Sequence, residues 1–357
     1  MEELTPVGPP DPLPWPDEPV GGPRLTACGD VLPPGLVAPP TVGAAAWVVA
    51  DLDTGAVLAA RAPHTRHRPA STLKVLTALV ALDRLDPDSI VEGTADDTHI
   101  EGSRVGVGPG GRYTVRQLLA GLLLNSGNDT ANALARELGG ATATTAAMDT
   151  VARQHGALDT RAASPSGLDG PGMASSAYDL ALLFRIAMRD PLFAETVATR
   201  TLTFPGFADQ PGFALANQNR LLANYPGALG GKTGFTDAAR HTFVGAAAHD
   251  GRRLVVSLVR GEQQPEPMWK QAATLLDLGF ALPPGAPPVG TLVDAPPDPP
   301  PVATLRGDGI DPDAGRGAPG LGPLAVGVAV GATCLGLLLG WSRRRRRAEP
   351  RRRHRVK

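Results

Sequence analysis

Hydrophobic residues form their clearest patterns in one block of the chain, residues 41–282. The block opens with two short apolar runs on either side of Asp53-Thr54-Gly55, and two further β-rich runs flank Asp250-Gly251 near its end. Short apolar runs around such turns are typical of β-hairpins, so we predict one hairpin at each end of the block. Residues 266–282 then repeat apolar side chains at helical spacing, which predicts a terminal helix.

The middle of the block, residues 71–200, has a helical pattern instead. The stretch TVRQLLAGLLL places four leucines on one face, with its Thr114 positioned as the N-cap. Further helices are predicted directly after Ser71 and after a cap at Ser175 or Ser176. Strands at both ends with helices between them predict one α+β domain, whose antiparallel sheet is built from the two ends of the block.

Outside this block, Pro, Gly and Ala dominate without hydrophobic periodicity. Of the 37 prolines, 12 lie in residues 1–40 and 11 in residues 283–321, so we expect extended linkers there. Residues 322–341 carry no charge and are long enough to cross a bilayer as one transmembrane helix. Residues 342–357 hold ten Lys and Arg against one Glu, a basic tail that is typical of the cytoplasmic side. We therefore expect a single-pass membrane protein whose folded block is extracytoplasmic.

Charge and composition exclude several classes of function. Removing the tail's +9 from the formal −1 of the chain leaves −10 for the rest, which is not typical of a nucleic-acid binder. The two cysteines lie in the first linker and in the apolar span, so we predict neither a disulfide nor a thiolate metal site in the block. His64 and His67 have no acidic or cysteine partner nearby in the sequence, so we interpret them as surface residues and predict no metal. The first twenty residues lack the regions of a signal peptide, and we expect export to depend on a signal upstream of the printed start or on the C-terminal span.

Lysine is rare in this chain, and two of its four lysines lie in short motifs of catalytic type. Alone, each motif is weak evidence, since S-x-x-K occurs by chance and S-G-N could be a plain helix-ending turn. Together, in this order and in fitting local structure, they indicate a catalytic site. The three motifs are Ser71-Thr72-Leu73-Lys74, Ser126-Gly127-Asn128 and Lys232-Thr233-Gly234.

The chemistry of S-x-x-K follows from its spacing. Residues three apart share a helix face, so Lys74 should reach the hydroxyl of Ser71. A serine hydroxyl is a poor nucleophile until a base removes its proton. Lysine, unlike arginine, can be that base when burial or a second cation, here Lys232, lowers its pKa. The segment Gly-Gly-Lys-Thr lacks the spacing of a phosphate-binding loop, and the G-x-S-x-G motif of other serine hydrolases is absent.

The ordered set of three motifs resembles that of penicillin-binding proteins and serine β-lactamases. Residues 103–135, 164–181 and 217–247 are similar to low-molecular-mass D-alanyl-D-alanine carboxypeptidases of the peptidase S11 family. The resemblance covers residues 41–282 and neither linker. It implies a β-lactamase/transpeptidase-like fold and a serine-type carboxypeptidase without a cofactor. Its substrate would be the peptidoglycan stem peptide, and β-lactams would be covalent inhibitors.

The resemblance also implies catalytic roles. Ser71 would be the acylated nucleophile and Lys74 its general base. Ser126 would relay the proton to the leaving amine, and Asn128 would hold the substrate backbone and orient Lys74.

Binding roles are implied for the third motif and the residue after it. Lys232 and Thr233 would bind the terminal carboxylate of the substrate. Gly234 would leave room for a peptide lying against the strand edge. The backbone N–H groups of Ser71 and Phe235 would form the oxyanion hole.

Some features depart from the family pattern or leave alternatives open. Arg240 replaces a glycine of many relatives, and the β-rich domain that follows in some relatives has no counterpart before the proline-rich linker. A β-lactamase would need a carboxylate-activated water, and residues 160–180 hold Asp169 and Asp179 but no Glu. An endopeptidase could use the same residues. A non-catalytic sensor of wall fragments or β-lactams would not need to keep all three motifs.

Overall fold

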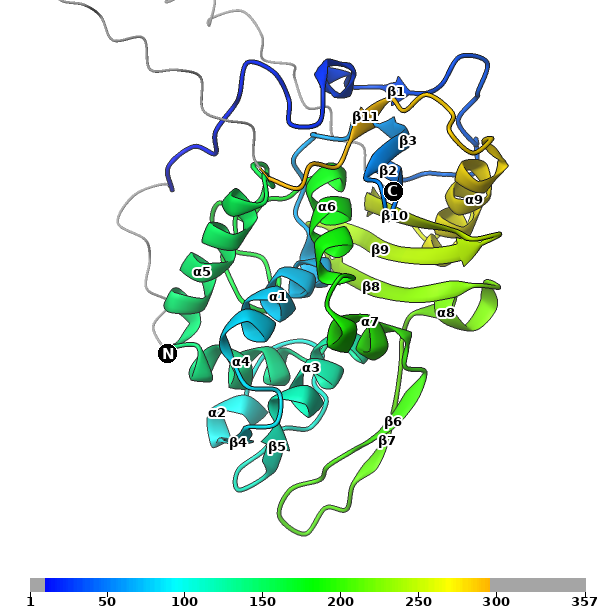
Figure 1. Ribbon diagram of the computed structural model, residues 1–357. Helices are drawn as coiled ribbons and strands as arrows, with labels where there is room; N and C mark the ends of the chain where they lie inside the picture. Colours follow the sequence, from blue (N-terminus) through cyan, green and yellow to red (C-terminus); the bar gives the residue numbers. More distant parts are fainter. Residues whose placement is uncertain (1–9, 296–357) are drawn as a thin grey trace, which may run out of the picture. The chain divides into compact units, whose positions relative to one another are not determined.

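The computed structural model describes residues 10–295, and its centre is a seven-stranded sheet. The strands run in the order β1-β3-β2-β10-β9-β8, β11 also pairs with β3, and every pairing is antiparallel (Figure 1). Both expected hairpins, β2–β3 and β9–β10, are confirmed, as is a sheet built from the two ends of the domain. The strands are β1 (Asp30–Val31), β2 (Ala46–Asp51), β3 (Ala56–Arg61), β8 (Ala228–Thr236), β9 (Arg240–His249), β10 (Arg252–Gly261) and β11 (Gly290–Thr291).

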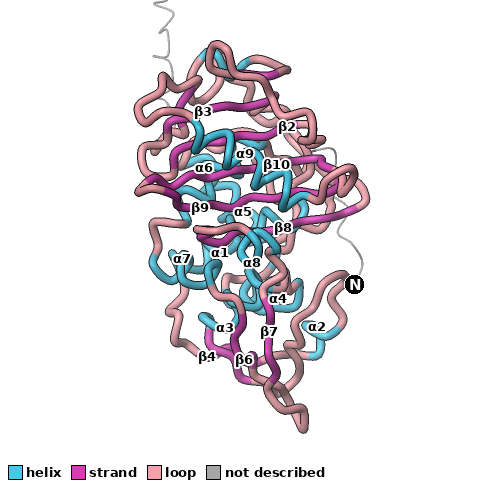
Figure 2. Tube along the Cα trace, turned by 90° about the vertical axis from the view of Figure 1, so that its right-hand side faces the viewer, coloured by secondary structure: helices cyan, strands magenta, loops and turns pink. Residues whose placement is uncertain are grey.

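The chain between β3 and β8 forms the helical region that the sequence predicts. Two small hairpins, β4–β5 and β6–β7, accompany the helices, and β6–β7 projects from the domain (Figures 1 and 2). The helices are η1 (Pro23–Thr26), η2 (Ala70–Leu73), α1 (Lys74–Arg84), α2 (Ala95–Thr98), α3 (Val115–Leu124), α4 (Asn128–Glu137), α5 (Ala141–Gln154), α6 (Ala177–Ala187), α7 (Pro191–Ala198), α8 (Arg220–Asn224) and α9 (Met268–Ala281). The small strands are β4 (Ile90–Glu92), β5 (Arg112–Thr114), β6 (Thr201–Phe204) and β7 (Phe213–Ala216).

Local capping explains where these helices begin. The hydroxyl of Thr114 accepts a hydrogen bond from the backbone N–H of Gln117 at the start of α3, as predicted. Of the two candidate caps for α6, the structure selects Ser176, whose Oγ accepts from the N–H of Asp179. The terminal helix predicted after the second hairpin is α9.

The sheet is covered on both faces, and each face has its own apolar cluster. Along β2, Val48 and Ala50 belong to the cluster on the side of α1 and α6, whereas Trp47 and Val49 belong to the cluster on the side of α9. This division follows from the two-residue period of a strand. Figure 1 shows α6 and α9 on opposite sides of the sheet. The free edge of the sheet, β8, lies against η2 and α7, where the sheet meets the helical region.

The folded part extends beyond residues 41–282, which corrects the expectation of solvated linkers on both sides. In the first proline-rich stretch, Leu25 and Val31 are buried and β1 pairs with β3. In the second, Val289 and Leu292 are buried and β11 pairs with the same strand. Both short strands satisfy backbone groups on β3 that would otherwise be unpaired, which composition alone does not reveal.

The predicted transmembrane helix at 322–341 and the basic tail at 342–357 lie outside the described residues, as do residues 296–321. Within residues 10–295, the helices are all too short or too polar to cross a bilayer.

Candidate active site

Ser71 and Lys74 meet where the turn η2 passes into α1. Lys74 is the first residue of α1 and has no exposed surface. Its Nζ lies 2.9 Å from Ser71 Oγ, 2.7 Å from Asn128 Oδ1 and 2.6 Å from the carbonyl oxygen of Ser166. The hydroxyl of Thr242 on β9 donates to the carbonyl of Pro69 at 2.7 Å, which fixes this turn to the sheet. The contact between Lys74 and the Ser71 hydroxyl that the S-x-x-K spacing predicts is therefore confirmed.

The partners of Lys74 determine what its nitrogen can do. The Ser166 carbonyl only accepts hydrogen bonds, and Asn128 turns its Oδ1 to Lys74 because its Nδ2 donates to the carbonyl of Glu101 at 2.6 Å. A neutral Lys74 has two N–H donors and one lone pair. Its donors are taken by these two acceptors, so within residues 10–295 the lone pair is left to the hydroxyl of Ser71. The arrangement therefore presents the Ser71 proton to a basic nitrogen.

Electrostatics favours the neutral form of Lys74. Burial lowers the pKa of Lys74 well below its ordinary value, and the nearby Lys232 lowers it further, while Asp129 acts in the opposite direction. Burial also lowers the pKa of Lys232, to about 7. Lys232 is 2% exposed and donates to the carbonyl of Thr233 at 2.7 Å. The lysine predicted as the second cation therefore lies close enough to Lys74 to lower its pKa.

The S-G-N motif forms the connection between α3 and α4. Ser126 has a φ of +63°, a left-handed conformation that is strained for a serine and frequent at functional sites. Asn128 is the first residue of α4 and joins Lys74 to the loop at Glu101. Ser126 lines the same cavity as Ser71. Within residues 10–295 no hydrogen bond joins Ser126 Oγ to Lys74 or Lys232, so the expected proton relay through Ser126 stays a prediction.

Asp129 is a structural component of the site that the sequence reasoning missed. Its buried carboxylate accepts backbone N–H groups from Val105, Gly106 and Val107 and from its own neighbour Thr130. These charge-assisted bonds hold the loop at residues 103–107 against α4, next to Asn128. The acidic residue directly after S-G-N is the signal that the sequence offers. The Ser166 carbonyl was missed as well, because a backbone acceptor has no sequence signature.

The K-T-G motif lies on the edge strand β8, and its glycine lies against the turn that carries Ser71. A side chain at Gly234 would place its Cβ 2.9 Å from the backbone nitrogen of Ser71 and 3.0 Å from that of Thr72. Gly234 therefore permits close contact between β8 and the turn that carries Ser71. It also lines the cavity at Ser71, so the room for a substrate peptide that the resemblance implies stays a prediction. Lys232 points to the same side, because it lies two residues before Gly234.

A cavity of about 480 Å³ opens at Ser71. Ser126, Thr233 and Phe235 also line it, so the structure brings the three motifs to one cavity. Because Phe235 follows the glycine that contacts the Ser71 turn, the two backbone N–H groups expected to form the oxyanion hole belong to adjacent segments.

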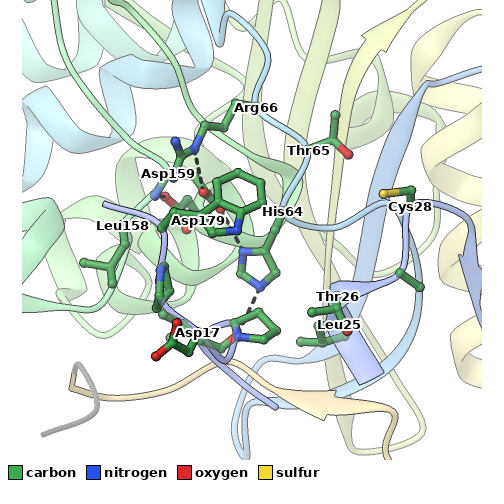
Figure 3. A pocket seen from close by; sticks show the side chains of 15 residues that line it. Asp17, Leu25, Thr26, Cys28, His64, Thr65, Arg66, Leu158, Asp159 and Asp179 are labelled. Carbon is green, nitrogen blue, oxygen red and sulfur yellow. Dashed lines mark hydrogen bonds and ion pairs between the residues drawn. The ribbon is translucent and has the colours of Figure 1, made fainter. Parts of the chain in front are cut away.

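A second cavity, of about 360 Å³, lies under the N-terminal segment and shares no lining residue with the first. Here the interpretation of His64 as a surface residue is wrong. Its Nδ1 lies 2.8 Å from Asp159 Oδ2, and its Nε2 lies 3.0 Å from the carbonyl of Val20. Figure 3 shows His64 and Arg66 both turned toward Asp159. Asp159 is 95 residues away from His64 in the chain, so local sequence could not reveal it.

Three residues of this cluster could together hold a metal ion, the one such group among residues 10–295. His64, Asp159 and Asp179 each bring one possible ligand atom within 4.8 Å of the others. However, His64 and Arg66 already bind both oxygens of Asp159. Burial and the charge of Asp159 raise the pKa of Asp179 well above its usual range, which favours its neutral form. We interpret the cluster as an ion-pair network that holds the N-terminal segment.

The protein is a serine peptidase with the penicillin-binding/transpeptidase fold, as comparison with solved structures shows. A crystal structure of a D-alanyl-D-alanine carboxypeptidase from Mycobacterium tuberculosis H37Rv has 53% identity and a TM-score of 0.69, over 73% of this chain and 99% of that one. The crystal structure of the Streptomyces K15 DD-transpeptidase has 29% identity and a TM-score of 0.65, over 69% and 100%.

The sequence comparisons give the family. The model of peptidase S11, D-alanyl-D-alanine carboxypeptidase, matches residues 35–263. The D-alanyl-D-alanine carboxypeptidase DacB2 of Mycobacterium tuberculosis is 53% identical over 270 residues, covering 74% of this chain and 92% of that protein. DacD of Salmonella typhimurium is 36% identical, over 68% and 64%. The chain therefore belongs to the peptidase S11 family.

Proposed function

We propose that this protein removes the terminal D-alanine from peptidoglycan stem pentapeptides through an acyl-enzyme on Ser71. The family and its relatives support a D-alanyl-D-alanine carboxypeptidase, a serine hydrolase of peptides. The observation that carries the assignment of residues is the buried Lys74, whose lone pair has the hydroxyl of Ser71 as its donor in the described part of the chain.

Acylation begins when neutral Lys74 takes the proton of Ser71 and Oγ attacks the carbonyl carbon of the penultimate D-alanine. The N–H groups of Ser71 and Phe235 stabilise the oxyanion of the tetrahedral intermediate. When the carbon–nitrogen bond breaks, the proton passes from Lys74 through Ser126 to the nitrogen of the leaving D-alanine. Asn128 and the Ser166 carbonyl hold Lys74 in position throughout. Lys74 is then neutral again.

Deacylation uses the same base. Lys74 takes a proton from a water that attacks the ester, and returns it to Ser71 Oγ as the ester bond breaks. The step restores the free enzyme and releases the shortened peptide. A β-lactam follows the acylation path, but its leaving nitrogen stays attached to the acyl group, so Ser71 remains blocked for longer.

Binding roles are proposed for the β8 residues. The backbone of β8 presents the free edge of the sheet to an extended peptide. Thr233 lines the cavity and offers a hydroxyl to the terminal carboxylate. Lys232, buried behind it, supplies positive charge next to Lys74. No cofactor enters any of these steps.

A second function is not needed to explain the site. The relatives described above have the names of carboxypeptidases and of a transpeptidase, and no observation favours a β-lactamase, an endopeptidase or an idle sensor.

For location we keep the sequence-based proposal. Residues 322–341 would anchor the protein in the membrane by one helix. The catalytic domain would then be extracytoplasmic, near the cell wall, and residues 342–357 cytoplasmic. The apolar span followed by ten Lys and Arg supports this topology. Labelling of an introduced cysteine on each side of the span, in intact and in lysed cells, tests it.

The test of the reaction uses the full chain and its Ser71→Ala variant. Each is incubated with a peptide ending in Lys-D-Ala-D-Ala, and free D-alanine is measured. We expect release by the parent protein and none by the variant, with a penicillin adduct of matching mass on the parent alone. Release that persists in Ser71→Ala would overturn the assignment of the nucleophile.

A further inference from the structure

The loop at residues 164–168 supplies the Ser166 carbonyl that Lys74 contacts. This loop lies directly on the turn η2, because a Cβ on Gly167 would be 2.2 Å from the carbonyl oxygen of Ala70. Gly167 has a φ of +80°, a left-handed conformation that favours glycine. The backbone of the loop is therefore placed against the catalytic turn, and what fixes it there bears on the catalytic base.

Two hydrogen bonds join this loop to other residues in the described part of the chain. One runs from Lys74 Nζ to the Ser166 carbonyl at 2.6 Å. The other runs from Thr77 Oγ1 to the Pro165 carbonyl, also at 2.6 Å. The further hydrogen bonds of residues 164–168 connect residues of the loop with one another. Apart from the base itself, Thr77 is thus the loop's hydrogen-bonded attachment to the domain.

Thr77 is well placed for this role. It follows Lys74 by three residues, so the two side chains lie on the same face of α1. Thr77 has no exposed surface. Its single hydroxyl proton goes to the Pro165 carbonyl, because its other neighbour, the Met148 sulfur at 3.6 Å, is a weak acceptor. Two side chains one turn apart on α1 therefore hold two successive carbonyls of the loop.

Lys74 is a poor anchor for the loop, because its hydrogen bonds change during the proposed reaction. It has two N–H donors when neutral and three after it takes the Ser71 proton. The bond from Thr77 does not change. Without a fixed Ser166 carbonyl, a donor of neutral Lys74 could turn toward Ser71, and the lone pair would no longer face the hydroxyl. Holding that carbonyl in place therefore keeps the base aligned with the nucleophile.

We propose that Thr77 is a positioning residue for acyl transfer: its hydroxyl holds the Pro165 carbonyl and thereby keeps the adjacent Ser166 carbonyl on Lys74. Thr77 does not line the cavity at Ser71, so it acts through the base and not on the substrate. The inference rests on the proposed acyl-enzyme and assigns what holds its base in position.

The experiment removes the hydroxyl and then restores it. The full chain, Thr77→Val and Thr77→Ser are compared by kcat and KM for a peptide ending in Lys-D-Ala-D-Ala and by the rate of acylation at saturating fluorescent penicillin. We expect Thr77→Val to lower kcat and the acylation rate roughly 10- to 100-fold, the range for a small misplacement of a catalytic group. KM should stay unchanged. Thr77→Ser keeps the donor and should retain most of both rates.

Thr144→Val is the matched control for a purely structural effect. Thr144 is also fully buried and donates to a backbone carbonyl, that of Gly140 at 2.9 Å, at the start of α5. Urea unfolding should show a similar loss of stability in Thr144→Val and Thr77→Val, but the control should keep its kcat. Thr77→Ala serves as a second variant without the hydroxyl, should the valine variant not fold.

Three results would overturn the proposal: an unchanged acylation rate in the variants without the hydroxyl, an equal loss in Thr77→Ser, or an equal loss in Thr144→Val. A loss confined to KM would overturn it too, since Thr77 would then affect binding. Failure of the carboxypeptidase assignment gives a different result. The unaltered protein would then release no D-alanine, while acylation by penicillin would still compare the variants.

Discussion

Replacing Lys232 with methionine should stabilise the protein while abolishing its activity. The side chain is buried, with one hydrogen bond, to the carbonyl of Thr233. Burial lowers its pKa to about 7, so the charged ammonium form of Lys232 is less stable in the folded protein than in the unfolded chain. Methionine has a similar shape and no charge, so it avoids this cost.

The size of the effect follows from the pKa of Lys232. A fall from 10.5 to about 7 corresponds to about 5 kcal/mol, at about 1.4 kcal/mol per pKa unit. At pH 7, where Lys232 is half protonated in the folded protein, about 4 kcal/mol of this cost remains. The variant leaves the Thr233 carbonyl without its donor, which costs about 1–3 kcal/mol. We therefore expect the free energy of unfolding to rise by about 1–3 kcal/mol at pH 7, in the range seen when buried charges are replaced.

The pH dependence makes the prediction specific. Between pH 7 and 10.5 the unfolded chain binds one proton more at this lysine than the folded protein does, so the stability of the parent rises with pH. The advantage of Lys232→Met should be largest below pH 7 and vanish between about pH 8 and 10. Urea unfolding of both proteins from pH 6 to 9.5 measures it.

Lys270→Met is the matched control, because the Lys270 side chain is 51% exposed and pairs with Glu266 on the surface. Its stability should change by no more than about 0.5 kcal/mol at any pH. If Lys232→Met were destabilised equally at every pH, Lys232 would carry no burial cost, and the argument for a depressed pKa would fail.

Three further variants test the site. Lys74→Arg should slow acylation by a fluorescent penicillin about 10²–10⁴-fold, because arginine cannot act as a base. Normal acylation would contradict this role of Lys74. Lys270→Arg makes the same change at an exposed lysine and is the control. Gly234→Ala places a Cβ 2.9 Å from the Ser71 nitrogen, so urea unfolding should show a loss of about 1–3 kcal/mol together with slower acylation. Asp129→Asn removes the charge that raises the pKa of Lys74. The acid limb of the pH profile of kcat/KM should therefore move to lower pH, and a shift to higher pH would contradict this effect of Asp129 on Lys74. The same variant should lose about 2 kcal/mol of stability in urea unfolding.

The features that could be predicted from the sequence are those set by neighbouring residues. Thr114 was identified as a cap because its partner, Gln117, lies three residues along the chain. The Ser71–Lys74 contact is equally local, since a helical turn brings the two side chains together. The hairpin turns are local as well, and together these elements indicated the α+β class.

The features that could not be predicted depend on residues far apart in the chain. His64 finds Asp159 across 95 residues. Gly234 must be a glycine because the backbone of Ser71 lies against it, and Ser71 is far away in the sequence. Asp129 binds backbone N–H groups, which every residue except proline has, so no residue type marks its partners. In each case the tertiary fold creates the contact, and a local pattern has no means of indicating it.

The two buried lysines have a chemical reason to be lysine in a chain whose basic residues are mostly arginine. Under the proposed mechanism, Lys74 must first be neutral to accept the Ser71 proton and must then release it to the leaving amine. The charge of Lys232 serves both steps, because the repulsion that lowers the pKa of Lys74 also makes the protonated form short-lived. Arginine could supply repulsion in place of Lys232 but could never replace Lys74, since it does not lose its proton. The catalytic base must be a group that burial can deprotonate. Of lysine and arginine, only lysine carries such a group.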